Sequence, residues 1–330
     1  MWKTFEWWVK RQLSRFPRLK SLASAVRRRV SPAFRGDAAG HWDARVDAVE
    51  STRPQGWLDS ELVEREHIRP QISSDPDVSY LEHFVKRHLE APVPRILSLG
   101  CGGGNLERAL LDLGAAEHID AYDDSPASIE LAQGLADAAG VGNRLTYAVG
   151  DSNTMALPAN TYDAVVIKMA LHHFESLEHV YEQVAKALKP GGFLMFNEFV
   201  GPTRFQWTDE QLEHMNRLLR GLPKRLRRRA PVVTIQRPLV ADMIALDPSE
   251  SVRSADILPL LEERFELVEL RPYGGTVLHI LLDHILPLLD PDSPEDCTVL
   301  RGLMAEERRL LDGGILPSDF AFVVARPRPL

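Results

Sequence analysis

Residues 91–200 constrain the fold most strongly, because short apolar runs alternate there with segments of helical period. Such alternation is typical of βα units that build a parallel sheet. The predicted strands are residues 95–99, 119–122, 145–149, 162–168 and 193–199, and the predicted helices are residues 105–113, 127–139 and 177–188. Two further strand-like runs, residues 265–270 and 320–326, are expected to complete the sheet.

Polar or glycine residues follow the predicted strands at the points where these end. Gly100-Cys101-Gly102-Gly103-Gly104 follows the first strand, Asp123 ends the second, and Asp151 follows the third. In an open parallel sheet, ligands bind outside the carboxyl ends of the strands. The glycine loop can approach a ligand closely, and the helix that it opens offers free amides. A nucleotide-like ligand is therefore predicted at this edge.

The glycine loop departs from two common nucleotide motifs. Asn105 stands where the dinucleotide pattern G-x-G-x-x-G requires its last glycine, and no Gly-Lys-Ser/Thr follows. Nicotinamide and ATP sites are therefore disfavoured. Asp123 has the spacing of a carboxylate that accepts hydrogen bonds from ribose hydroxyls, and Asp151 is placed to accept an adenine amine. Each aspartate taken alone is more often a turn or helix-cap residue than a ligand, but capping does not readily explain the glycine loop, Asp123 and Asp151 together at successive strand ends.

Five blocks in order resemble the class I S-adenosylmethionine-dependent methyltransferases, particularly the small-molecule type similar to quinone-biosynthesis methyltransferases. The resemblance covers residues 78–200, and its blocks are ILSLGCGGGN, AYDDSP, VGDSNTM, YDAVVIKMALHHF and LKPGGFLMFNEF. It implies an α/β fold with a doubly wound, seven-stranded, mostly parallel Rossmann-like sheet whose last strand is antiparallel. It also implies S-adenosyl-L-methionine as the cofactor.

The resemblance assigns cofactor contacts to individual positions of this chain. It places the methionine part against the loop residues Gly100, Cys101, Gly102 and Gly104. It places the ribose at Asp123, the adenine beside Asp124, and the adenine amine at Asp151 and Ser152. Lys168 and Met169 are expected on the methionine side. Ser98 is a departure, because families of this type often carry an acid at that position.

Methyl transfer from a sulfonium requires alignment of acceptor, methyl and sulfur, with a base if the acceptor is a hydroxyl. The candidate catalytic residues are His172, His173 and Glu198, near the ends of the fourth and fifth strands. The alternative is that the histidines cap or pack a helix and that the glutamate orients a loop. His172, Glu175 and His179 share a helical face, but surface positions explain them better, so no metal is predicted.

Four segments are expected along the chain. Residues 1–77 form an N-terminal helical arm and cap, 78–202 the cofactor-binding core, 203–260 a helical lid, and 261–330 the completion of the sheet. The lid contains the basic run of residues 224–229. A solvated helix face is favoured for this run over a clamp for an acceptor phosphate or carboxylate.

The charge of −8 is unevenly distributed. Residues 1–35 carry ten Lys and Arg against the single acid Glu6. The acidic remainder disfavours a nucleic-acid partner. The basic arm, with aromatic residues near helical spacing, predicts either peripheral membrane contact or packing on the domain or on a second subunit of a homodimer. Two cysteines and the absence of a signal-peptide pattern favour a cytoplasmic protein.

The leading hypothesis is S-adenosylmethionine-dependent methyl transfer to a small-molecule acceptor: a glycan, a lipid or a secondary-metabolite intermediate. The alternative is a non-catalytic S-adenosylmethionine-binding scaffold or regulator of the same fold.

Overall fold

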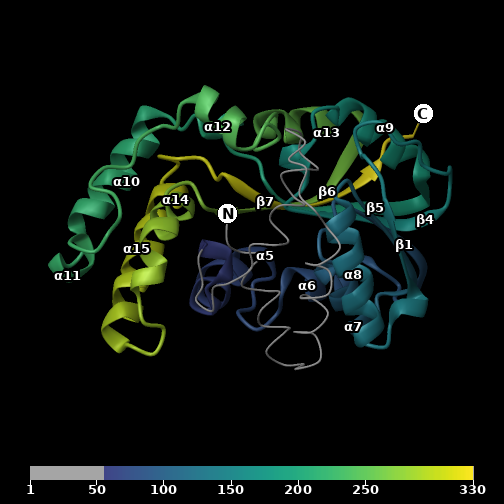
Figure 1. Cartoon of the computed structure of the whole chain (residues 1–330), viewed down its shortest axis with the longest axis horizontal. Coiled ribbons are helices and arrows are strands. Elements are labelled where there is room, and N and C mark those ends of the chain that lie inside the picture. Colours follow the sequence, from purple (N-terminus) through teal and green to yellow (C-terminus); the bar gives the residue numbers. More distant parts are fainter. Residues whose placement is uncertain (1–55, 330) are drawn as a thin grey trace.

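A computed structural model describes residues 56–329. Its centre is one seven-stranded sheet with the order β3-β2-β1-β4-β5-β7-β6 (Figure 1). The strands are β1 (Val93–Leu99), β2 (Ala116–Asp123), β3 (Leu145–Val149), β4 (Tyr162–Lys168), β5 (Leu188–Phe199), β6 (Phe265–Gly274) and β7 (Phe320–Pro327). β7 is antiparallel to β5 and β6, and the other pairings are parallel. The predicted fold class is confirmed.

Both faces of the sheet are buried, which explains why the central strands are apolar throughout rather than alternating. In β4, Ala164 and Val166 belong to one core cluster, whereas Val165 and Ile167 belong to the other. Helices α6 (Tyr80–His88), α7 (Asn105–Asp112) and α8 (Pro126–Ala138) cover one face, and α9 (Leu177–Ala187) and α13 (Ile257–Arg264) cover the other (Figure 1). Ser125 caps α8 by accepting from Ser128 N at 3.0 Å, as the Ser-Pro sequence predicts.

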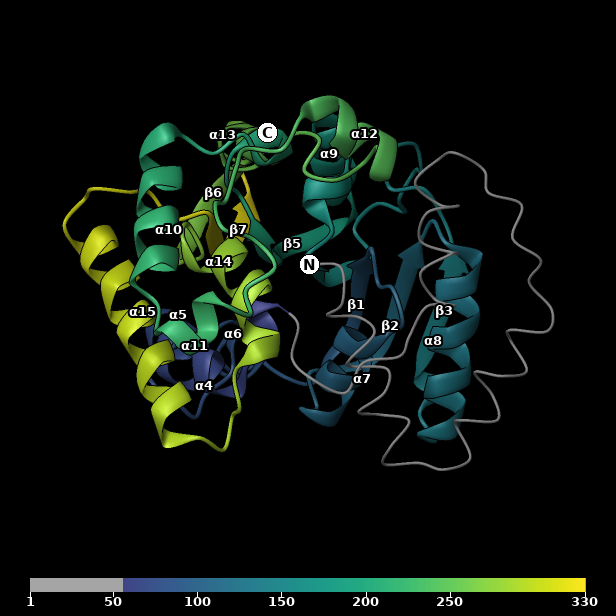
Figure 2. The ribbon, with the colours of Figure 1, turned by 60° about the vertical axis from the view of Figure 1, so that its left-hand side comes forward.

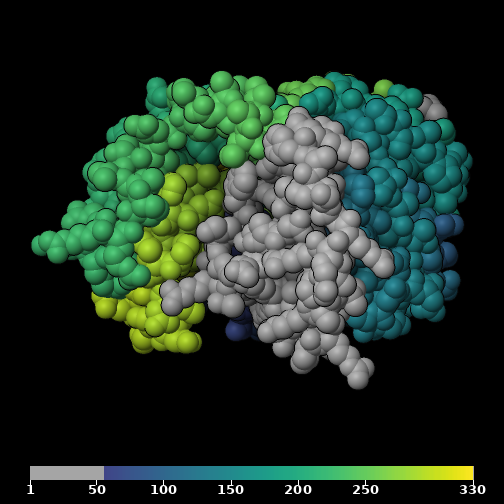
Figure 3. Space-filling view, viewed as in Figure 1, coloured from purple at the N-terminus to yellow at the C-terminus, as the bar shows by residue number. Residues whose placement is uncertain are grey.

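A helical lobe extends beyond the β6–β7 side of the sheet. It contains α10 (Asp209–Gly221), α11 (Lys224–Arg227), α14 (Leu278–Ile285) and α15 (Pro294–Asp312) (Figure 2). In the chain, α12 (Val240–Leu246) follows α11 and precedes α13. The space-filling view shows the lobe at one side of the core (Figure 3). The lobe thus combines the predicted lid with helices inserted between β6 and β7, which sequence reasoning had assigned only to completing the sheet.

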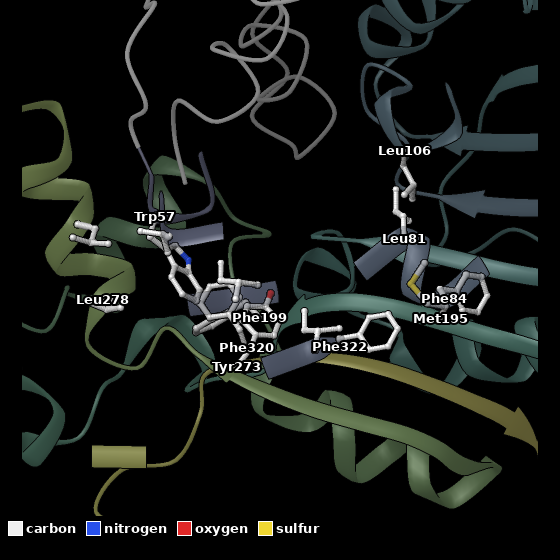
Figure 4. Close-up of a cluster of buried hydrophobic side chains, with 14 of the residues drawn as sticks. Trp57, Leu81, Phe84, Leu106, Met195, Phe199, Tyr273, Leu278, Phe320 and Phe322 are labelled. Carbon is white, nitrogen blue, oxygen red and sulfur yellow. The ribbon is translucent and has the colours of Figure 1, made fainter. Parts of the chain in front are cut away.

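The segment before α6 is tied to the strand ends by aromatic packing. Trp57, in the short helix η1 (Trp57–Asp59), stacks on Tyr273 with ring centroids 5.8 Å apart and meets Phe320 at 4.9 Å (Figure 4). Phe320 in turn contacts Phe199 at 5.2 Å. This packing holds η1 and the following helices α4 (Glu61–Val63), η2 (Glu64–Ile68) and α5 (Arg69–Ile72) next to the sheet.

The prediction for the basic arm, residues 1–35, lies outside the described residues. Within residues 56–329, no helix combines the length and the apolar character needed to cross a membrane.

Candidate cofactor and acceptor site

A cavity of about 410 Å³ lies at the carboxyl ends of the parallel strands. This volume is in the range of small-molecule sites, roughly 300–1,000 Å³. Every predicted cofactor residue but the glycine at position 104 lines it: Gly100, Cys101, Gly102, Asp123, Asp124, Asp151, Ser152, Lys168 and Met169. The structure therefore brings together residues that are far apart in the sequence.

The glycine loop adopts backbone conformations that side chains disfavour. The φ angles of Gly100, Gly102 and Gly104 are +68°, +50° and +73°. A Cβ at Gly100 would overlap the Cβ of Ala170, and one at Gly104 would overlap the hydroxyl of Tyr147. Gly104 thus serves close packing beside the cavity rather than lining it.

Asp123 fixes the glycine loop to the next helix. Its Oδ2 accepts from Gly102 N at 2.8 Å, and its Oδ1 accepts from Ser125 N at 3.0 Å. Asp123 also lines the cavity, so its structural role in the turn is compatible with a role in binding a ligand. The geometry suits a cofactor ribose, because the loop and the carboxylate are held in one rigid unit.

Asp151 organises the turn after β3. Its Oδ1 accepts from Asn153 N at 2.8 Å, and its Oδ2 accepts from Thr154 Oγ1 at 3.1 Å. Asp151 is exposed, whereas its neighbour Ser152 is buried, and both line the cavity. This end offers acceptors of the kind that an adenine amine needs.

Glu107 lies next to Ser98, the position at which the resemblance led us to expect an acid. Ser98 Oγ donates to Glu107 Oε1, and both residues are fully buried behind the glycine loop. Burial raises the pKa of Glu107. Sequence reasoning missed this residue, although a glutamate at the buried side of α7 was a readable signal.

Lys168 and Glu64 add charge to the cavity wall beside Tyr80. Lys168 Nζ lies 5.9 Å from the ring centroid of Tyr80, and Glu64 comes from η2. Burial raises the pKa of Glu64, while Lys168 and Arg69 oppose that shift. Met169 has a φ of +50° and donates its amide to Asn197 O at 3.0 Å, which turns the chain into the cavity wall.

Glu198 is a buried support rather than a cavity residue. Its Oε2 accepts from the amides of Ala170 and Leu171, both at 2.8 Å, and its Oε1 accepts from His172 Nδ1. It is 0% exposed and does not line the cavity. The prediction that Glu198 acts directly as a base is therefore corrected to a positioning role, because its oxygens face the turn after β4.

His172 and His173 both line the cavity, and the lid supplies their partners. His172 Nε2 lies 3.7 Å from Glu250 Oε1, and His173 Nδ1 lies 3.0 Å from Ser249 Oγ. Burial acts to lower the pKa of His172, but the charge and the hydrogen bond of Glu198, together with the charge of Glu250, outweigh it, so the pKa is raised. Sequence reasoning missed Ser249 and Glu250, because residues 247–251 carry no periodic pattern.

Two sequence hypotheses are not supported by the geometry. His179 Nε2 contacts Met155 O at 3.0 Å and Glu175 is exposed, so His172, Glu175 and His179 do not converge. The basic run at 224–229 does not line the cavity. Its Arg225 pairs with Glu295 at 3.2 Å and with Asp296 on α15, which agrees with the solvated-face interpretation.

The comparisons with known proteins find similar methyltransferases. The family described as "Methyltransferase domain" matches residues 97–196. The chain is 30% identical over 129 residues to a sterol 24-C-methyltransferase of Gibberella zeae, covering 39% of this chain and 34% of that protein. It is 28% identical over 133 residues to the demethylmenaquinone methyltransferase of Thermus thermophilus, covering 40% of this chain and 60% of that protein.

A solved structure resembles the fold over most of the chain. It is a geranyl diphosphate C-methyltransferase from Streptomyces coelicolor A3(2), with a TM-score of 0.50 at 13% identity, covering 91% of this chain and 100% of that one. The curated relatives are matched over only part of their length, about a third for the sterol methyltransferase.

The strand order and the strand-end cavity define a Rossmann-like protein of the type that binds S-adenosylmethionine. Residues 97–196 match the methyltransferase-domain family, so this part of the chain has the sequence pattern of a class I S-adenosylmethionine-dependent methyltransferase. The residues present fit this cofactor, because backbone loop, ribose-side carboxylate and adenine-side acceptors all border one cavity.

Proposed function

We propose that this chain transfers the methyl group of S-adenosylmethionine to a small-molecule acceptor. The observation that carries the proposal is the single cavity that connects Asp123 and Asp151 with His172, His173 and Glu250. Cofactor contacts and a polar, partly basic acceptor end therefore share one enclosed volume. The curated relatives are named as methyltransferases of a sterol and of demethylmenaquinone, and these names support a small-molecule acceptor.

The cofactor supplies an electrophilic methyl group, and the chain supplies position. The glycine loop would hold the methionine part and Asp123 the ribose, and the turn after β4 directs His172 and His173 into the cavity. In-line displacement requires the acceptor atom opposite the sulfur, so alignment accounts for much of the rate. A hydroxyl acceptor would release its proton at the histidine end.

The charge of the lining favours a neutral or cationic acceptor. Among the described lining residues, Lys168 is the only lysine or arginine, whereas six are carboxylic acids: Asp59, Glu64, Asp123, Asp124, Asp151 and Glu250. Such a lining repels free phosphates and carboxylates. We therefore propose an uncharged glycan, lipid or secondary-metabolite intermediate that presents a hydroxyl or a nucleophilic carbon.

The function is tested by binding and by product formation. S-adenosylmethionine titrated into the full chain in a calorimeter is expected to bind, and incubation with candidate acceptors is expected to yield S-adenosylhomocysteine. Binding without product from any acceptor would favour the non-catalytic scaffold. Absence of binding would exclude both functions.

Replacing Asp123 with alanine should weaken S-adenosylmethionine binding by at least about 10-fold. The substitution removes a charged acceptor, worth roughly 1.5–3 kcal/mol, and frees the loop that Gly102 N anchors. Calorimetry on this variant and on Asp112→Asn, an exposed aspartate of α7, measures the effect. Equal affinities in the two variants would show that Asp123 does not hold the cofactor.

Replacing His173 with alanine should lower turnover by about 100-fold while changing cofactor affinity less than about 3-fold. The reason is that His173 lines the proposed acceptor end of the cavity, whereas Asp123 and Asp151, which lie far from it in the sequence, are the proposed cofactor contacts. His179→Ala is the matched control, since that ring contacts only the loop at Met155. Unchanged turnover in His173→Ala would remove the residue from the reaction.

A further inference from the structure

His172, His173 and Glu250 form a compact cluster in the cavity. Each offers one ligand atom, and these atoms lie within 4.8 Å of one another. His172 is 1% exposed and Glu250 is 6% exposed. The histidines come from η4 (Leu171–His173), whereas Glu250 comes from the loop after α12, so tertiary folding alone assembles the cluster.

Hydrogen bonds set the tautomer of His172. Glu198 accepts from Nδ1, so Nδ1 carries the hydrogen, and Nε2 presents a lone pair when the ring is neutral. Nε2 is buried and has no hydrogen-bond partner among residues 56–329. It faces Glu250 Oε1 at 3.7 Å, which places two acceptors opposite each other. A positive species between them would resolve this arrangement.

His173 is oriented in the same way. Ser249 Oγ donates to Asp247 Oδ1 at 2.7 Å, so its lone pair accepts from His173 Nδ1 at 3.0 Å. Nε2 of His173 is then the acceptor nitrogen of that ring. The two imidazole centroids are 4.1 Å apart.

We propose that His172 Nε2, His173 Nε2 and a carboxylate oxygen of Glu250 bind one divalent transition-metal ion. Two imidazoles and one carboxylate suit Zn²⁺, Fe²⁺, Mn²⁺ or Co²⁺ rather than Mg²⁺ or Ca²⁺, which prefer oxygen ligands. Glu198, Ser249 and Asp247 then act as the outer partners that orient metal-binding histidines. Metal binding itself does not depend on the proposed function. Only the role of the ion rests on it, which is to hold an acceptor oxygen at an open coordination position.

A second cluster serves as an internal comparison. His83 and His88 approach Glu269 at 3.1 and 2.7 Å. Arg271 Nε already contacts Glu269 Oε1 at 2.8 Å, so a permanent cation neutralises that carboxylate. No metal is expected there.

Metal uptake is tested on the chelator-treated full chain, without cofactor or acceptor. Co²⁺ is titrated while its visible absorption is recorded, and Zn²⁺ affinity is measured by competition with a chromophoric chelator. The wild type should bind about one ion per chain. Glu250→Gln should weaken binding by more than about 100-fold, and Glu198→Gln by about 10–100-fold. The matched control His88→Gln should bind as the wild type does.

Three results would overturn the proposal. These are no Co²⁺ absorption at millimolar metal, unchanged affinity in Glu250→Gln, or loss of the ion only in His88→Gln. S-adenosylhomocysteine binding reports whether each variant is folded. If Glu250→Gln does not fold, His173→Gln is tested in its place. Because cofactor binding is a separate titration, loss of metal uptake and failure of the proposed function are distinguishable.

Discussion

Replacing Glu307 with glutamine should lower the free energy of unfolding by about 3–5 kcal/mol, as expected when a buried charge network loses one member. Glu307 is 0% exposed, and its Oε1 accepts from the amides of Val277 and Leu278, both at 2.9 Å. Its Oε2 accepts from Gly275 N at 3.0 Å and meets His67 Nε2 at 2.9 Å. One carboxylate therefore joins the start of α14 to the helices before α6.

Urea unfolding monitored by circular dichroism measures this loss. Glu306→Gln is the matched control, because Glu306 is partly exposed and pairs with Arg309 at 2.9 Å. Surface pairs of this kind contribute about 1 kcal/mol or less. If both variants lost the same small amount, Glu307 would not be the connection between the lobe and the core.

Replacing Glu198 with glutamine should lower turnover by about 100-fold or more, while cofactor affinity changes less than about 10-fold. A glutamine amide can accept at only one end, so it cannot satisfy the Ala170 and Leu171 amides, which share one oxygen, together with the Phe199 amide at the other. An NH2 group at that second end would also require His172 Nδ1 to give up its hydrogen. The His172 ring would lose its orientation, whereas Asp123 and the glycine loop remain in place.

Turnover is followed as S-adenosylhomocysteine formed with the acceptor that the screen identifies. Glu178→Gln, at an exposed glutamate paired with Arg253, is the control. A positioning role predicts a fall in turnover with little change in cofactor affinity, and Glu198→Asp should recover part of it. Equal losses of turnover and affinity would indicate general disruption of the strand ends instead.

The strands and the strand-end residues that line the cavity were predictable because their signals are local. The prediction for residues 162–168 has the bounds of β4, since a strand buried on both faces must be apolar throughout. Asp123 and Asp151 were readable because each lies at or just after the end of a strand. β5 begins earlier than predicted, at Leu188, because this residue pairs with Tyr162 across an irregular register that no local pattern reveals.

The acceptor end was not predictable, because its partners come from distant segments. Glu250 and Ser249 lie in a lid loop without periodicity, yet they meet His172 and His173 from the turn after β4. Glu198 was identified as a candidate, but only the structure shows that its oxygens are used by backbone amides.

The amino-acid sequence by itself determined the sheet, its order of strands and helices, and the cofactor edge, because hydrophobic period and strand-end residues are properties of short segments. Only the tertiary structure decided what faces the acceptor. A buried side chain such as Glu250 or Glu307 acquires its partners from loops that are remote in the chain, and their approach depends on how whole helices pack.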